Sequence, residues 1–218
     1  MKKTHILVAA LLLVGVPAFA AQKKAVKPAP QPASVVQSIG INGEYTVYDA
    51  DDGIDFNIGG ATVQYSRDIY TTKGGTVFTL RISGSYGTGS YEQEDVPVIR
   101  NDEFTGKFTN VSMDVTSFSL MIGCDANYAV NERCRLFVGP RLGYKSVSFD
   151  EDENTKMKGD EDEWKATVYG ITAGVRYDFK DSKLGCEAGF SHLWNAWDVD
   201  DEDTTTSNTF YAGVYYSF

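Results

Sequence analysis

The acidic residues of this chain fall in short runs, and one run has the spacing of cation ligands. Asp150, Asp152, Asn154 and Glu161 stand at relative positions 1, 3, 5 and 12, the ligand positions of a calcium-binding loop. Thr155 occupies the sixth position, where the sharp turn of such a loop requires glycine. This departure argues against a true EF-hand loop. It leaves loose coordination of Ca²⁺ or Mg²⁺ as one interpretation and ordinary solvation as the other, and we expect no other cofactor.

Most of the remaining acidic residues are grouped in the same way. Of the 30 acidic residues, 21 fall in the segments 49–53, 88–112, 149–163 and 198–207. The formal net charge is −10, and no basic patch suited to a nucleic acid accompanies these runs. Two interpretations stay open: mutual repulsion of solvated loops, or divalent cations that bridge the carboxylates to the phosphates of lipopolysaccharide.

Three cysteines could form one disulfide in an oxidising compartment. Cys124 and Cys134 flank the segment "DANYAVNER" with an even separation, so both can face the same side of a hairpin. We therefore expect these two cysteines to pair. Cys186 is the third cysteine and has no partner in this scheme. It lies at outward parity, and either it is a small hydrophobic residue that faces lipid or it competes for the disulfide.

His192 is the one histidine after residue 20, and it lies in "FSHLWNAWD". Ser191 is its neighbour, but adjacent residues of a strand point to opposite faces, so the two cannot act as a nucleophile and base. The alternative is an interfacial histidine beside Trp194 and Trp197. The sequence shows no metal-ligand cluster and no nucleotide-binding loop, and we expect no enzyme.

The N-terminal residues predict export. Lys2 and Lys3 precede an apolar run over 6–16, and Ala18-Phe19-Ala20 offers small residues where a signal peptidase cuts, so residues 1–20 read as a signal peptide. Residues 21–35 hold three lysines and three prolines and are interpreted as a Lys/Pro-rich periplasmic linker. Residues 36–218 form one domain.

Apolar residues in this domain recur with period two, the period of half-buried strands. Eight strands are expected near 37–48, 54–66, 76–87, 113–124, 135–148, 164–179, 184–197 and 208–218. The connections at 67–75, 125–134 and 180–183 are short, whereas those at 88–112 and 149–163 are long. Short turns at one end and long loops at the other are typical of a transmembrane β-barrel.

The strands "FVGPRLGYK" and "ITAGVRYDF" and the C-terminal "YYSF" resemble the small outer-membrane β-barrel family that includes the OmpA transmembrane domain and the OmpX-type proteins. The resemblance covers residues 36–218. It implies an all-β fold: an eight-stranded antiparallel transmembrane β-barrel of up-and-down topology. It also implies that Tyr216 and Phe218 form the assembly signal that the barrel-assembly machinery reads.

Charged residues of both signs lie at inward parity and predict a paired network in the lumen. The set consists of Glu44, Arg81, Arg141, Arg176 and Glu187. In the rival fold, a soluble lipocalin-like barrel or sandwich, these charges would face water. Aromatic residues near the strand ends favour the membrane barrel because they can form interfacial girdles: Tyr45, Tyr65, Tyr86, Tyr144, Trp164, Tyr177, Trp194 and Trp197.

An eight-stranded barrel has an interior that side chains nearly fill, so a general diffusion pore is not expected. The predicted function is a structural or cell-surface interaction role in the bacterial outer membrane, with acidic extracellular loops. A narrow channel is the alternative. A lipid A-modifying enzyme is more remote, because "SHLW" resembles the His-x-Ser stretch of the deacylases but carries Trp194 in place of the nucleophilic serine. The expected partners are outer-membrane lipid, lipopolysaccharide and the barrel-assembly machinery, for a monomer that binds no nucleic acid.

Overall fold

A computed structural model describes residues 36–49, 56–100, 103–151, 163–198 and 205–218 of the chain. The predicted signal peptide (1–20) and linker (21–35) lie outside these residues. Within the described part of the chain, no helix is long and apolar enough to cross a membrane.

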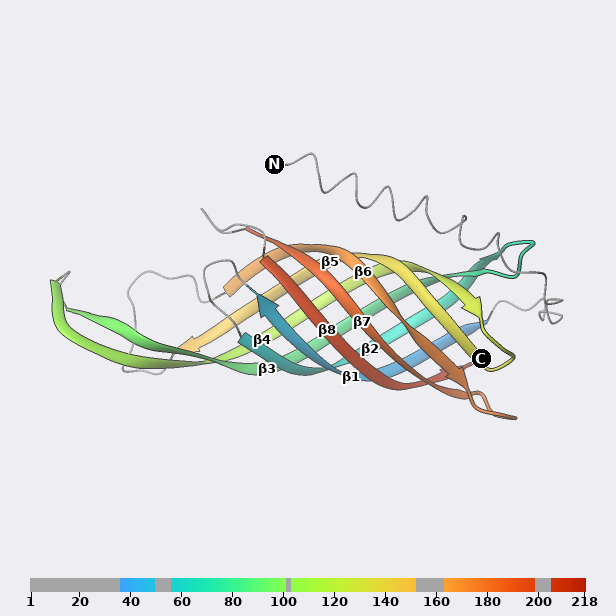
Figure 1. The fold of residues 1–218 in the computed structure, drawn as a ribbon, viewed down its shortest axis with the longest axis horizontal. Coiled ribbons are helices and arrows are strands. Elements are labelled where there is room, and N and C mark those ends of the chain that lie inside the picture. The colour runs from blue at the N-terminus through green and yellow to red at the C-terminus, as the bar shows by residue number, and fades with distance from the viewer. Residues whose placement is uncertain (1–35, 50–55, 101–102, 152–162, 199–204) are drawn as a thin grey trace. The chain divides into compact units, whose positions relative to one another are not determined.

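The described residues form eight strands. They are β1 (Gln37–Asp49), β2 (Phe56–Thr71), β3 (Val77–Arg100), β4 (Glu103–Ala129), β5 (Cys134–Glu151), β6 (Glu163–Asp178), β7 (Leu184–Trp197) and β8 (Thr205–Ser217). Each strand pairs antiparallel with the next in sequence, and β8 pairs with β1, which closes the sheet into a barrel (Figure 1). The predicted eight-stranded up-and-down antiparallel barrel is confirmed.

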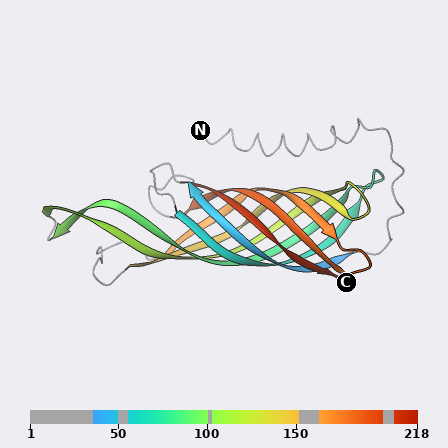
Figure 2. The ribbon, with the colours of Figure 1, turned by 60° about the horizontal axis from the view of Figure 1, so that its bottom comes forward.

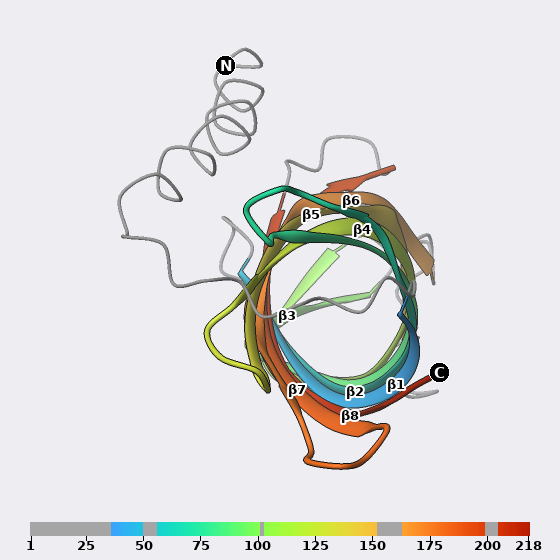
Figure 3. The same ribbon diagram turned by 90° about the vertical axis from the view of Figure 1, so that its right-hand side faces the viewer.

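The two ends of the chain's barrel domain meet where the sheet closes. Ser38 lies opposite Ser217, and the pairing of β1 with β8 continues to Asp49 and Thr206. Beyond the last strand, the Phe218 amide donates to the Gln37 carbonyl at 2.9 Å. Closure satisfies the edge groups of both strands, so the barrel has no open edge along its pairing seam (Figure 3).

The short connections lie together at one end of the barrel, which we call the turn end: residues 72–76, 130–133 and 179–183. The first of these turns is built around Gly75, whose φ of 86° suits glycine. The Thr76 amide donates to the Thr72 hydroxyl across this turn at 3.0 Å. The opposite end, which we call the loop end, is where β1, β3, β5 and β7 finish.

The segment 88–112 is not a loop, contrary to the prediction. β3 and β4 remain paired as far as Arg100 and Glu103, with register shifts near Gln93 and Pro97. The acidic residues there suggested a loop, but Val, Ile and Phe recur among them, and these residue types favour strands. The β3–β4 hairpin therefore extends beyond the other strands at the loop end (Figures 1 and 2).

The two faces of the sheet have opposite polarity, and the polar face is the buried one. Buried polar side chains line the interior, including Ser38, Asn42, Thr46, Gln64, Thr79, Arg81, Ser119, Asp125, Asn127, Arg141, Thr172, Arg176, Glu187 and Ser207. Large apolar side chains cover the exterior, including Ile39, Ile41, Val63, Ile82, Leu120, Ile122, Leu136, Leu142, Val175, Leu184 and Val214. This is the reverse of a soluble protein, which buries its apolar face.

Candidate functional site in the barrel lumen

Seven strands each contribute one polar side chain to a single level of the lumen, which we call the charged layer. Its members are Asn42 (β1), Gln64 (β2), Arg81 (β3), Asp125 (β4), Arg141 (β5), Arg176 (β6) and Glu187 (β7), all buried. These residues share the inward parity of their strands, so closure of the barrel brings them together across the axis.

Glu187 is the most highly connected member of the charged layer. Its Oε1 accepts from Nη1 of Arg81 at 2.9 Å and from Nδ2 of Asn42 at 3.1 Å, and it also accepts from Nε2 of Gln64. Its Oε2 accepts from Nε of Arg176 at 2.9 Å. Two arginines therefore depend on one carboxylate that is 3 % exposed.

Asp125 is the second carboxylate of the charged layer. Its Oδ2 accepts from Nε of Arg81 at 2.9 Å, and its Oδ1 accepts from Nη1 of Arg141 at 2.6 Å. Arg81 thus bridges the two carboxylates, since its Nη1 binds Glu187. Three guanidinium groups and two carboxylates form one connected network.

Aromatic rings contact the arginines on the turn-end side of the charged layer. The Arg81 guanidinium carbon lies 4.8 Å from the centre of the Phe137 ring, and that of Arg176 lies 4.3 Å from the Tyr215 ring. The Tyr215 hydroxyl donates to Asp178 at 2.6 Å, and Asp178 is also ion-paired with Arg135 at 2.9 Å. Rings so placed stabilise the cations and fill the space between the strands.

Inward glycines provide the room for the large polar side chains. A methyl group on Gly139 would lie 2.6 Å from Oδ1 of Asp125, and one on Gly123 would meet Nη1 of Arg141. Gly123 is the cross-strand partner of Arg141, so the guanidinium lies directly over the glycine. The glycine-rich pattern of the strands is therefore a packing requirement of the network.

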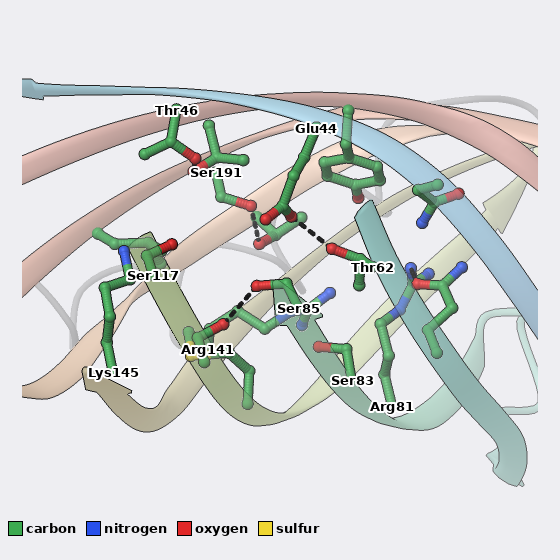
Figure 4. Close-up of a pocket in the computed structure, with 18 of the residues that line it drawn as sticks. Glu44, Thr46, Thr62, Arg81, Ser83, Ser85, Ser117, Arg141, Lys145 and Ser191 are labelled. Carbon is green, nitrogen blue, oxygen red and sulfur yellow. Dashed lines mark hydrogen bonds between the residues drawn. The ribbon is translucent and has the colours of Figure 1, made fainter. Parts of the chain in front are cut away.

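A cavity of about 80 Å³ lies on the loop-end side of the charged layer (Figure 4). Hydroxyl groups line most of it, from Thr46, Thr62, Ser83, Ser85, Ser117, Ser119, Thr172, Ser191, Thr209 and Tyr211. Two further charges reach it: Glu44, which accepts from the Thr62 hydroxyl, and Lys145, whose Nζ lies 4.7 Å from the centre of the Tyr48 ring. The volume suffices for a few water-sized species.

An apolar cluster fills the lumen at the loop end. It consists of Tyr48, Phe56, Ile58, Tyr91, Val115 and Val147, with Met113, Phe149 and Trp197 packed against it. Trp164 packs edge-on against both Phe149 and Trp197. Trp164 and Trp197 were expected in an external girdle, but their neighbours place them with this cluster, because they share the parity of the inward residues Ala166 and Asn195.

The structure separates the predicted lumen residues into two groups. Arg81, Arg141, Arg176 and Glu187 lie together in the charged layer, whereas Glu44 binds Thr62 and makes no ion pair with a described residue. Four further lumen residues were not predicted: Asp125, Lys145, Gln64 and Asn42. Inward parity was the signal that could have found them. Asp125 was overlooked because β4 was predicted to end at residue 124, whereas it continues to Ala129.

His192 lies on the outer face of the barrel, at the opposite parity from its inward neighbour Ser191. Its Nδ1 is 2.8 Å from Oδ1 of Asn208, and its ring packs edge-on against Trp194, which stacks on Tyr169. Ser191 points inward and shares a hydrogen bond with Thr172 at 2.7 Å. The predicted neighbour Trp197 lies inside instead. This arrangement resembles an interfacial aromatic site, and among the described residues the side-chain hydrogen bond of His192 is to Asn208 and not to a serine.

The predicted disulfide between Cys124 and Cys134 is wrong, because all three cysteines are free. Both residues lie at the same parity of the hairpin, as expected, but they are not equidistant from the turn. Gly123 pairs with Arg141 and Ala126 with Val138, so Cys124 lies opposite Pro140. Six residues of strand separate this level from Cys134, about 20 Å at roughly 3.3 Å per residue, while a disulfide requires Cα atoms within about 7 Å.

The predicted cation ligands lie largely outside the described residues. Asp152, Asn154 and Glu161 belong to the undescribed segment 152–162, and only the backbone of Asp150 is described, near the end of β5. Among the described side chains, no three histidine, cysteine, aspartate or glutamate residues come close enough to hold a metal ion. Tyr216 and Phe218, the predicted assembly signal, stack on the exposed outer face with ring centres 6.4 Å apart.

Comparison with known proteins supports the fold. Neither a protein-family model nor a curated protein matches the chain. Among solved structures, Neisserial surface protein A (NspA) aligns with a TM-score of 0.52 at 15 % identity, covering 84 % of this chain and 97 % of that one. The chain has the fold of the small outer-membrane β-barrels.

A second neighbour is Ail, the attachment invasion locus protein of Yersinia pestis, solved in complex with the heparin analogue sucrose octasulfate. It aligns with a TM-score of 0.50 at 16 % identity, covering 85 % of this chain and 99 % of that one. At these identities the likeness concerns the fold and leaves the activity open.

Proposed function

We propose that this protein is an integral protein of the bacterial outer membrane that serves a structural or binding role at the cell surface. The observation that carries the proposal is the inverted polarity of the barrel. Apolar side chains such as Ile41 (55 % exposed) and Leu120 (52 % exposed) cover the outside, while charged groups are buried inside. Lipid stabilises such an exterior, whereas water does not, and a closed barrel leaves no backbone group unpaired in hydrocarbon.

The two ends of the barrel suggest its orientation. In outer-membrane barrels short turns face the periplasm and longer loops face the outside. The turn end, with both chain ends of the domain, would then be periplasmic, and the β3–β4 hairpin would project from the cell. NspA, by its name a surface protein, and Ail share this fold, which is consistent with the proposal.

Two layers of side chains fill the lumen, which argues against a diffusion pore. The charged layer connects residues from seven strands across the lumen, and the apolar cluster fills the loop end. A narrow channel is the second candidate, favoured by the hydroxyl-lined cavity between these layers. Conductance in planar bilayers separates the two: the proposal expects none above the lipid baseline, and reproducible single-channel steps would favour the channel.

The β3–β4 hairpin is the surface best suited to a binding role. β2 pairs with β3 only up to Ser90, and β5 pairs with β4 only from Met113. Beyond these residues the two outer edges of the hairpin have no strand partner among the described residues, and unpaired edges accept a strand from another chain. The acidic residues of this segment disfavour a polyanionic partner such as the heparin analogue bound to Ail, and favour a neutral or cationic one.

The C-terminal residues are proposed to guide assembly. Phe218 follows the strand that closes the barrel, and its backbone pairs with Gln37 of β1. Deletion of Phe218 should leave the protein exported but reduce its yield in the outer membrane, because the assembly machinery would lose its signal. An unchanged yield in the outer-membrane fraction would count against this role.

The localisation can be tested by fractionation and gel mobility. The protein should sediment with outer membranes, resist extraction by sodium carbonate, and run faster on a gel when unheated than when boiled, because a folded barrel binds less detergent. Recovery in the soluble periplasmic fraction would contradict the proposal.

A further inference from the structure

A patch of polar and aromatic side chains lies on the outer face at the turn end, where β8 closes on β1 (Figures 1 and 3). Gln37 and Phe218 exchange backbone hydrogen bonds at this closure, and Arg67 of β2 is the cross-strand partner of Gln37. The Tyr216 ring stacks on Phe218, and Nζ of Lys183 lies 5.8 Å from the centre of the Tyr216 ring. These five residues connect three neighbouring strands with the turn before β7, and we call them the seam patch.

Among the described residues, two cations and one amide of the seam patch have no acceptor. Arg67 and Lys183 are exposed, and neither makes an ion pair or a side-chain hydrogen bond there. The Tyr65 hydroxyl donates to Oε1 of Gln37 at 2.7 Å, which orients the amide and leaves its NH2 group to donate elsewhere. None of these donors is fully buried, so a ligand outside the barrel can reach all three.

The seam patch carries a positive charge. Arg67 and Lys183 provide two cations, and the terminal carboxylate of Phe218 opposes one of them. Asp68, the neighbour of Arg67, accepts from a threonine hydroxyl of the lumen at 2.7 Å and so faces the other side of the sheet. The turn that holds Lys183 has a further lysine and an aspartate at 180–181, which cancel. One positive charge remains on the patch, and it favours an anionic ligand.

The seam patch marks the boundary between the apolar outer face and the turns. On its loop-end side lie the exposed apolar side chains of Ile39, Val63 and Val214. Aromatic residues and cations at the edge of an apolar belt lie at the level of the lipid headgroups. In the orientation proposed above, on which this inference depends, the headgroups at the turn end belong to the periplasmic leaflet.

We propose that the seam patch binds the phosphate of an anionic phospholipid in the periplasmic leaflet. The Arg67 guanidinium and the Gln37 amide lie on neighbouring strands and donate to the phosphate oxygens, for which a guanidinium is a well-matched donor. Lys183 supplies the second positive charge, and the rings of Tyr216 and Phe218 contact the glycerol and the first methylene groups of the acyl chains. A zwitterionic phospholipid offers the same phosphate, but its own cation cancels the gain in charge, so it should bind more weakly.

The first test compares two lipids that share their acyl chains and differ in the charge of the headgroup. The full chain, folded in a mild nonionic detergent, is titrated with dimyristoyl phosphatidylglycerol or dimyristoyl phosphatidylcholine, and native mass spectrometry counts the bound lipids. The site predicts that one phosphatidylglycerol binds about fivefold more tightly than phosphatidylcholine, since one positive charge near a lipid surface contributes about this factor. Equal affinities would overturn the proposal.

Variants separate the seam patch from the general charge of the turn end. Arg67→Gln and Lys183→Gln should each weaken the binding of phosphatidylglycerol by about fivefold. Lys180→Gln removes the same charge from the turn that holds Lys183, and Lys73→Gln removes it from the turn after β2, and both should keep the affinity of the parent protein. If all four variants weaken binding equally, the charge of the whole turn end attracts the lipid, and the localised site is wrong.

Gln37→Leu tests the geometry of the site at constant charge. It removes the amide donors and should weaken the binding of phosphatidylglycerol, and an affinity equal to that of the parent protein would exclude the amide from the site. Sodium glycerol phosphate offers the headgroup chemistry without acyl chains and should not displace the lipid at an equal concentration. Displacement would identify a site for soluble phosphates and contradict the membrane source.

Each protein is first checked for heat-modifiable gel mobility and for insertion into lipid vesicles, which report a folded membrane barrel. A parent protein that inserts but binds the two phospholipids equally contradicts the seam patch alone. A parent protein that fails to insert contradicts the proposed function.

Discussion

The charged layer and the apolar cluster fill the same lumen a few residues apart, yet they are stabilised in different ways. In the charged layer, each group depends on named partners: Glu187 binds Arg81 and Arg176, and Asp125 binds Arg81 and Arg141. In the apolar cluster, residues such as Ile58 and Val147 are buried against one another without directional bonds.

This difference predicts how each region responds to substitution. In the charged layer an isosteric change that removes one charge leaves its partners buried and unpaired, so shape is preserved while stability is lost. In the apolar cluster the loss depends on the volume removed and is graded. Substitutions in the two regions can test this contrast.

Glu187→Gln should destabilise the barrel by about 3 to 5 kcal/mol, because it leaves the buried guanidinium groups of Arg81 and Arg176 without their shared carboxylate. The measurement is the free energy of unfolding from urea titrations in detergent. Glu132→Gln is the matched control, since Glu132 is exposed in the turn after β4 and should change little. Coinciding midpoints for Glu187→Gln and the parent protein would show that the charged layer does not stabilise the fold.

Gly139→Ala should destabilise the barrel by about 1 to 3 kcal/mol, because the added methyl group would collide with Asp125 and the backbone of its strand. Gly59→Ala is the control: a methyl group there meets nothing within 4 Å. Both variants are compared by urea unfolding. Equal midpoints would mean that the close approach at Gly139 does not hold the network in place.

Ile58→Val in the apolar cluster should cost only about 1 kcal/mol, because it removes one buried methylene group. Ile58 is 2 % exposed, whereas Ile41 faces outward and is 55 % exposed, so Ile41→Val in lipid or detergent serves as the control and should be nearly neutral. If Ile58→Val lowered the free energy of unfolding as much as Glu187→Gln does, the contrast between the two regions would disappear.

The smallest expected effect concerns an exposed carboxylate at the loop end. The hydroxyl of Ser146 donates to Glu163 at 2.7 Å and, together with Lys165, holds the pKa of the Glu163 carboxyl below its usual value. The contribution of this contact is present above the pKa of the unfolded chain and is lost as the pH falls through the lower folded pKa.

Replacement of Ser146 by alanine should therefore raise the pKa of Glu163 toward its usual value, as measured by NMR titration of the carboxyl carbon. Ser182→Ala, in the turn before β7, is a control that should leave this pKa unchanged. A Glu163 titration that does not respond to Ser146→Ala would show that the hydroxyl is not the main cause.

The fold could be predicted from the sequence because apolar residues alternate with polar or small residues along each strand of the barrel. Period two, the aromatic C-terminus and the turn spacing were sufficient for eight strands, and parity alone placed Arg81, Arg176 and Glu187 on the inward face. These features can be recognised in each strand alone. In a closed barrel, the parity of a residue in its strand then decides whether its side chain faces the lumen or the outside.

The errors arose where information beyond one strand was needed. The pairing of β3 with β4 beyond residue 88 is a property of two strands, and acidic residues obscured it. The cysteine assignment used parity but not register, which depends on where the turn is centred. The partnership of Arg141 with Asp125 likewise depends on the register of β4 with β5, which places the two side chains at neighbouring levels.

The most direct test of the central claim is the environment of the outer face. In a chain with Cys124, Cys134 and Cys186 replaced by alanine, nitroxide labels are placed singly along β4 at positions 117 to 122 and studied in lipid vesicles. Phe118, Leu120 and Ile122 face outward, whereas Ser117, Ser119 and Met121 face the lumen. The account predicts that oxygen relaxes the labels at the outward positions strongly while a water-soluble nickel complex does not. Free access of the nickel complex to those positions would show that water, and not lipid, surrounds the barrel.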